Sequence, residues 1–133
     1  MKLIEVEGIG DVFAGKLHAA GLDTLEELLE SGATPKGREI IAVKAGIDQG
    51  RILTWVNHAD LMRVKGIGPE YAELLEASGV DSCPELSHRR ADNLVAKMKA
   101  VDEEKHLTRR VPTESEVIDW ISQAAALPQV VYH

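Results

Sequence analysis

Two short glycine motifs of this chain are the residues best suited to chemistry. Gly8-Ile9-Gly10 and Gly66-Ile67-Gly68 lie 58 residues apart, and each is followed by a stretch with helical apolar spacing. A glycine turn that leads into a helix exposes backbone N–H groups, which attract anions together with the helix dipole. Each motif is therefore a candidate anion site, and phosphate groups are typical ligands of such sites.

Carboxylates lie beside both glycine motifs. Asp11 directly follows the first motif, and Glu70 comes two residues after the second. A carboxylate at a helix N-terminus interacts with the dipole itself and repels a phosphate at close range. Lys16 and Lys65 are the only cations near enough in the sequence to offset this repulsion. The alternative that the glycines only form tight turns therefore stays open.

Most Lys and Arg residues lie outside the glycine motifs, in one segment between them and a second segment after them. Net charge alternates from −5 over residues 1–30 to +3 over 31–65, −5 over 66–87, +3 over 88–112 and −3 over 113–133. Affinity for nucleic-acid phosphates comes from clustered cations. The second basic segment, residues 88–112, offers Arg89, Arg90, Lys97, Lys99, Arg109 and Arg110; the first, residues 31–65, offers Lys36, Arg38, Lys44 and Arg51. Both segments could equally neutralise the acidic segments, within one chain or between copies.

No set of side chains has the spacing of a catalytic or metal site. The five histidines are scattered and pair with no Cys or carboxylate at metal-ligand spacing, and His58 is expected on the surface. Cys83 is the only thiol, with no base near it in the sequence. The motifs of phosphate-binding loops with Lys-Ser/Thr and of nucleophile elbows are missing. We therefore expect a protein that is not an enzyme and takes no metal, cofactor or small-molecule substrate.

The segments that position these residues are helical nearly throughout. Hydroxyl residues at 24, 82 and 113 each precede a glutamate by three positions, and Thr34-Pro35 is a further helix start. Glycines 21, 46 and 79 fit helix ends. Helices are expected over about 35–45, from Asp48 to the second motif, over about 91–104 and over 113–127, with Val12, Phe13 and Leu17 on an inner face. The sequence therefore predicts an all-α fold, with residues 105–112 irregular.

The glycine motifs belong to an internal duplication. Residues 3–28 and 61–86 are identical at twelve of twenty-six positions, and Trp55 and Trp120 correspond at an offset of 65. Such a duplication predicts a single compact domain over residues 1–133, with one repeat at 3–60 and a second at 61–127 around a pseudo-two-fold axis. Each repeat would hold a hairpin pair of helices followed by two more. Because almost no chain precedes the first motif, we expect residues 113–127 to pack on it.

The pattern apolar-x-x-apolar-x-Gly-apolar-Gly-x-x-x-Ala, at Leu3–Ala14 and Leu61–Ala72, resembles the helix-hairpin-helix superfamily. The whole chain also resembles an uncharacterised two-repeat family, domain of unknown function 4332. The superfamily resemblance implies phosphate binding by amides at Gly8, Gly10, Gly66 and Gly68, without reading of base sequence. Superfamily members that bind DNA usually carry Lys or Arg just after the second glycine, where this chain has Asp11 and Pro69. Residues 6–10 and 64–68 are the first and second hairpin loops.

Two classes of function fit these observations. One is a non-catalytic module that binds the DNA or RNA backbone; the other is a protein-interaction or self-assembling adaptor module in which the hairpins are only structural. No run of about eighteen apolar residues is present, so no membrane partner is expected. A single cysteine fits the reducing cytoplasm. The expected partner is a nucleic acid, a protein or a second copy of the chain.

Overall fold

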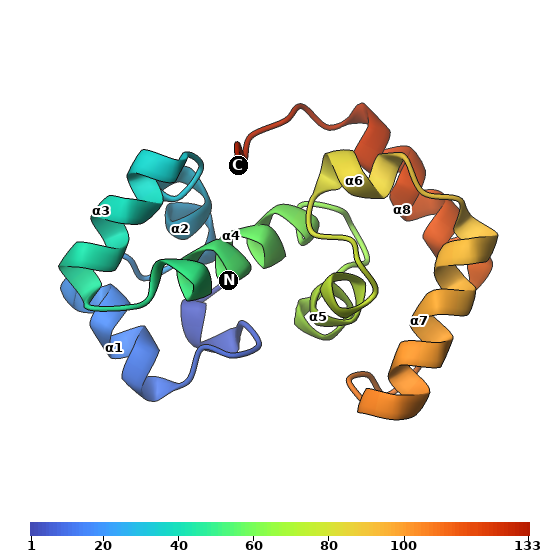
Figure 1. Cartoon of the computed structure of the whole chain (residues 1–133), viewed down its shortest axis with the longest axis horizontal. Helices are drawn as coiled ribbons and strands as arrows, with labels where there is room; N and C mark the ends of the chain where they lie inside the picture. Colours follow the sequence, from blue (N-terminus) through green and yellow to red (C-terminus); the bar gives the residue numbers. More distant parts are fainter. The chain divides into compact units, whose positions relative to one another are not determined.

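The computed structural model describes residues 1–133 and confirms the all-α prediction (Figure 1). A short 3-10 helix, η1 (Leu3–Glu5), precedes eight α-helices. These are α1 (Asp11–Ala19), α2 (Leu25–Ser31), α3 (Pro35–Ala45), α4 (Gln49–Leu61), α5 (Pro69–Ala77), α6 (Cys83–Ser87), α7 (Ala91–Lys105) and α8 (Glu114–Ala126). One isolated antiparallel bridge joins Lys2 and Thr24. No helix combines the length and apolar character needed to cross a lipid bilayer.

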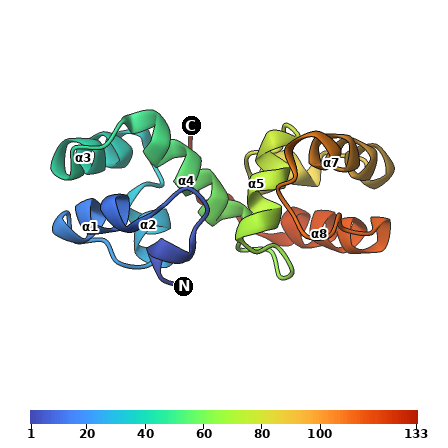
Figure 2. The same cartoon turned by 90° about the horizontal axis from the view of Figure 1, so that it is seen from below.

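The chain divides into two compact units. Unit 1 consists of Met1–Asp60 together with Val130–His133, and unit 2 consists of Leu61–Gln129. Within unit 1, α3 packs against α1 and α2; within unit 2, α8 packs against α6 and α7, and α7 also against α5. Figure 2 shows α1 beside α3 in unit 1 and α7 beside α8 in unit 2. The boundary between residues 60 and 61 falls where the second sequence copy begins.

Local capping signals set the helix ends. Thr24 and Thr113 each form a full capping box, in which the hydroxyl accepts from the N–H three residues on and that residue's glutamate accepts from the cap N–H. Ser82 accepts a hydrogen bond from the backbone N–H of Glu85, and Thr34 caps α3 ahead of Pro35. Helix α3 ends at Gly46 in the left-handed conformation. These helix starts and ends confirm the predictions made from short-range patterns.

Each unit has an aliphatic core around one tryptophan. In unit 2 the core includes Val64, Ile67, Leu74, Leu75, Leu86, Leu94, Met98, Val117 and Trp120. In unit 1 the buried residues include Leu3, Val6, Ile9, Leu17, Leu28, Ile41, Ile52, Trp55 and Val56. Two expectations are wrong: His58 is only 3% exposed, because α4 is buried on every side from Trp55 to Asp60, and Val12 is 70% exposed.

A tryptophan edge covers a glycine in each hairpin loop. Gly8 and Gly66 have φ of +86° and +102°, and an added Cβ would lie 3.4 Å from Nε1 of Trp55 or 2.8 Å from Nε1 of Trp120, respectively. The prediction that residues 113–127 pack on the first motif is wrong, because α8 carries Trp120 to the second hairpin loop. The first loop instead receives Trp55 from α4. Each loop is thus covered by the tryptophan of its own sequence copy.

Candidate nucleic-acid interface

Helix α1 begins directly after the second glycine of the first motif, and helix α5 begins directly after the second glycine of the second motif. Gly10 and Gly68 are the N-cap residues, and neither helix start has a capping side chain. The first hydrogen bonds of the two helices run from Ala14 N to Gly10 O and from Ala72 N to Gly68 O, both at 2.9 Å. The N–H groups before them are those that a helix leaves without an internal acceptor. Both loops therefore present amides to an external anion.

The fold does not require glycine at either N-cap. Gly10 and Gly68 have φ of −89° and −97°, in the extended region that any residue adopts. A Cβ at either position would meet no atom within 4 Å. A Ser or Asp at the N-cap would bond the free amides itself, whereas glycine leaves the space in front of the helix open. That open space admits the oxygen of a ligand at both helix starts.

Arg109 brings a cation to the second hairpin loop. Its Nε lies 3.3 Å from Oε1 of Glu70, with side chains that are 91% and 37% exposed, respectively. The carboxylate that the sequence places next to the Gly68 amides is therefore paired. Lys65, within the loop, is also exposed. The second loop thus has two positive side chains near it, Lys65 and Arg109, which lie about forty residues apart in the sequence.

Arg110 lies beside the same helix start, in a bidentate ion pair. Its Nη1 and Nη2 lie 2.7 and 3.1 Å from the two carboxylate oxygens of Glu116. The pair raises the pKa of Arg110, and burial raises the pKa of the neighbouring Tyr71, an effect that Arg110 partly offsets. Lys65, Arg109 and Arg110 lie among the carboxylates of Glu70, Asp102, Glu116 and Asp119. The cations at this helix start are therefore balanced by carboxylates, in a segment that the sequence shows as acidic.

Asp102 holds Arg109 and Arg110 in place. Its Oδ1 accepts from the N–H groups of Leu107 and Thr108 at 2.8 and 2.9 Å, and its Oδ2 accepts from Thr108 Oγ1 at 3.0 Å. The chain turns there through His106, at φ +53°. Asp102 is 9% exposed, and it was not among the residues predicted from the sequence. The only signal available was an aspartate at a helix end followed by a threonine six residues later.

Gln123 holds the backbone of the second hairpin loop. Its side-chain oxygen accepts from Lys65 N at 2.8 Å, and its Nε2 donates to Lys65 O at 3.0 Å. The same Nε2 donates to Asp119 Oδ2 at 2.8 Å. This contact was also missed from the sequence, although Gln123 lies one helical turn after Trp120. The second loop is therefore fixed on one side by an indole and on another by an amide.

The other basic residues of the 88–112 segment do not join this site. Arg89 pairs with Glu85 at 3.9 Å and Arg90 with Asp92 at 2.9 Å, both near the start of α7. The 15 residues of α7 span about 22 Å, which separates this pair of arginines from Arg109 and Arg110. Lys97 and Lys99 are exposed on nearly opposite sides of α7, about 160° apart around its axis. The six cations therefore do not form one patch.

The first hairpin loop has a weaker set of cations. Lys16 Nζ and the Arg51 guanidinium lie 5.9 and 5.0 Å from the centre of the Phe13 ring, which packs edge-on against Trp55. Arg38, which the sequence placed among the surface cations of the first basic segment, is 3% exposed. Its guanidinium donates to backbone carbonyls instead. The second loop thus has an arginine paired with the carboxylate at its helix start, whereas the cations of the first loop lie against the Phe13 ring.

Replacing Arg110 with alanine should raise the pKa of Glu116. The Arg110 hydrogen bond and the capping bonds of Thr113 lower that pKa from 4.5 to about 2. Because the folded-state pKa is lowered, this contribution to stability is fully present above the ordinary value and is lost as pH falls toward 2. Carbon NMR titration of the Glu116 carboxyl would show the rise in Arg110→Ala. The matched variant Arg90→Ala, which removes the partner of Asp92, should leave Glu116 unchanged.

The comparisons with known proteins identify a family. The model described as "Domain of unknown function (DUF4332)" matches residues 7–127. No curated protein and no solved structure matches the chain significantly. The matched range includes both glycine motifs and both tryptophans, and it covers nearly the whole chain. The protein therefore belongs to the DUF4332 family.

Proposed function

We propose that this protein is a non-catalytic cytoplasmic module that binds the phosphate backbone of nucleic acid without reading base sequence. The second hairpin loop is the main contact. The observation that carries the proposal is an uncapped helix start at Gly68, where a glycine that the fold does not need lies beside Lys65 and Arg109. A helix-hairpin-helix arrangement of the loop accounts for this geometry.

The amides of Glu70 and Tyr71 would donate to a phosphate oxygen, because they are the first N–H groups of α5 after Pro69. Arg109 would then exchange Glu70 for the phosphate. Exposed ion pairs contribute only about 0–1 kcal/mol, so this exchange costs little, and guanidinium–phosphate pairs are bidentate. With few phosphate contacts, we expect a dissociation constant near the non-specific range of about 10⁻⁴–10⁻⁶ M, with strong salt dependence.

Titrations of a labelled DNA duplex and a labelled single-stranded RNA, read by fluorescence anisotropy at low and moderate salt, test this proposal. Arg109→Ala should weaken binding about equally for all base sequences and reduce the salt slope by about 0.9. Gly68→Ala should also weaken binding, because its methyl group occupies the approach to the amides, while the melting temperature stays the same. Lys36→Ala removes an exposed cation of unit 1 and is the matched control. Absence of binding at low salt, or normal binding by Gly68→Ala, would contradict the proposal.

A protein-interaction or self-assembling adaptor module is the second candidate. It is favoured by the ion pairs of Arg89, Arg90, Arg109 and Arg110, each of which has a carboxylate partner within unit 2. In that case the basic residues serve the stability of unit 2 and the loops are structural. Light scattering over a range of concentrations, together with the nucleic-acid titration, separates the two candidates.

A further inference from the structure

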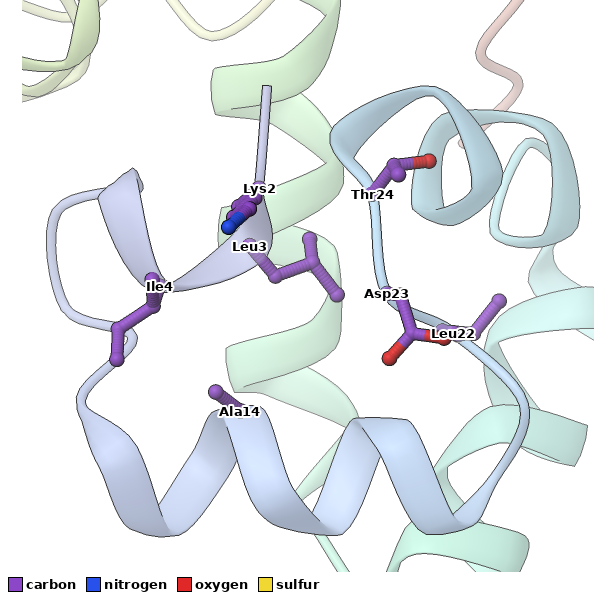
Figure 3. A pocket seen from close by; sticks show the side chains of 7 residues that line it. All are labelled: Lys2, Leu3, Ile4, Ala14, Leu22, Asp23 and Thr24. Atoms are coloured by element: carbon purple, nitrogen blue, oxygen red, sulfur yellow. The ribbon is translucent and has the colours of Figure 1, made fainter.

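An apolar groove lies in unit 1, which does not include the second hairpin loop. Leu3 and Ile4 of η1 and Ala14 of α1 face a common space, which Leu22 and Asp23 close from the loop between α1 and α2 (Figure 3). The groove has a volume of about 420 Å³, and aliphatic side chains form most of its surface. Ile4 is 47% exposed at its edge. An exposed aliphatic groove of this kind is typical of a binding surface.

The matching positions of the second sequence copy are covered. Leu61, Ala72 and Val80, which align with Leu3, Ala14 and Leu22, have 0% exposure. In the first copy, Ala14 is only half-buried. The same pattern of residues is therefore compatible with a closed apolar environment. In unit 1 the opening lies at Ala14 and Ile4, while Leu3 and Leu22 form a floor that is 2% and 6% exposed.

Carboxylates surround the groove. Asp23 lines it, Glu27 Oε1 accepts from the N–H groups of Asp23 and Thr24 at 3.1 and 3.0 Å, and Glu5 Oε2 accepts from Lys2 N at 2.8 Å. The positive groups nearby are the ammonium of Lys2 and His18, whose Nδ1 pairs with Asp23 Oδ1. The terminal ammonium of Met1 pairs with a fourth carboxylate, Glu26, at 3.4 Å. The larger segment of residues 1–30 carries −5. An occupant with aliphatic side chains toward the floor and cations at its edges is complementary in both respects.

We propose that this groove binds a cationic amphipathic helix of a partner protein. One turn of such a helix presents aliphatic side chains three and four residues apart, which matches a short groove bounded by two helical segments. Lysine or arginine residues beside that face reach the carboxylates of Glu5, Asp23 and Glu27. The few polar groups of the lining do not converge on a point, so a small polar metabolite has little to fix it. This inference concerns unit 1 and does not rest on nucleic-acid binding by unit 2.

The probe is a synthetic helical peptide with leucine at positions i, i+3, i+4 and i+7 and lysine elsewhere, labelled for fluorescence anisotropy with the full chain. A second peptide replaces lysine with glutamate. Ala14→Leu fills the groove, and Ala19→Leu makes the same change at an exposed position of the same helix. We expect Ala14→Leu to bind the lysine peptide at least about tenfold more weakly than the unsubstituted chain does. The glutamate peptide should bind to the unsubstituted chain at least as weakly as the lysine peptide binds to Ala14→Leu. Ala19→Leu should bind like the unsubstituted chain.

Asp23→Asn tests the contribution of charge. We expect this variant to lose several-fold in affinity for the lysine peptide, and its affinity should depend less on salt. Thermal melting confirms that each variant is folded before titration. Equal binding by Ala14→Leu and Ala19→Leu would overturn the proposal. It would also be overturned if Ala14→Leu abolished a concentration-dependent dimer in the absence of peptide, because the occupant would then be a second copy of the chain.

Discussion

Gly66→Ala is expected to destabilise unit 2 by about 3 kcal/mol. Gly66 has φ of +102°, where a side chain strains the backbone, and its Cβ would come within 2.8 Å of Trp120 Nε1. Trp120 is 2% exposed in the centre of the unit 2 core and also contacts Tyr71, at 5.2 Å between ring centres. The indole has little room to retreat, so both the backbone strain and the contact would add to the cost.

Gly68→Ala is the matched control, two residues away in the same motif. Its φ of −97° and the empty space around its Cβ position lead us to expect a change below about 0.5 kcal/mol. Urea unfolding followed by tryptophan fluorescence and circular dichroism would measure both variants. Similar losses of stability in Gly66→Ala and Gly68→Ala would show that the indole does not set the requirement for glycine at position 66.

Arg38→Met is expected to destabilise unit 1 by about 2–4 kcal/mol. The Arg38 guanidinium donates to Gly32 O and to Tyr132 O, both at 2.9 Å, and the residue is 3% exposed. Burial lowers the pKa of the guanidinium from its ordinary value. Methionine would fill much of the same volume, but it leaves both carbonyl oxygens without their charged donor.

The C-terminal residues 130–133 should lose protection in Arg38→Met. Tyr132 N donates to Ala33 O at 2.8 Å, so the exchange rate of this amide reports whether the tail stays bound. The matched control is Lys36→Met on the same helix, because the Lys36 side chain is 76% exposed. Its Nζ lies 3.8 Å from Glu39 Oε2, and an exposed ion pair of this kind contributes little to stability. Unchanged exchange at Tyr132 in Arg38→Met would contradict the role given to the guanidinium.

The helix ends could be read from the sequence because their causes are local. Thr24 and Thr113 bind N–H groups three residues away, and Gly46 supplies the left-handed conformation at the end of α3. These interactions hold in any tertiary setting. The boundary between the two compact units coincides with the start of the second sequence copy, which is visible in the sequence itself, although the duplication predicts one compact domain.

The contacts that build the candidate interface could not be read in the same way. The Arg109–Glu70 pair and the Gln123–Lys65 hydrogen bonds join residues 39 and 58 positions apart, and neither involves an unusual residue type. The burial of Arg38 depends on a carbonyl of Tyr132, which no local pattern indicates. A cation in a sequence therefore reports charge, but its partner and its exposure are set by packing between distant segments.

The assignment of residues 130–133 to unit 1 has a consequence for the order of folding. Unit 2 is contiguous in the chain, whereas unit 1 is interrupted by it. Every segment of unit 2 precedes residues 130–133 in the chain and is therefore made before the residues that complete unit 1. The contact between Arg38 and Tyr132 spans 94 residues, a long loop to close. We therefore expect unit 2, which is one continuous segment, to fold before residues 130–133 close unit 1.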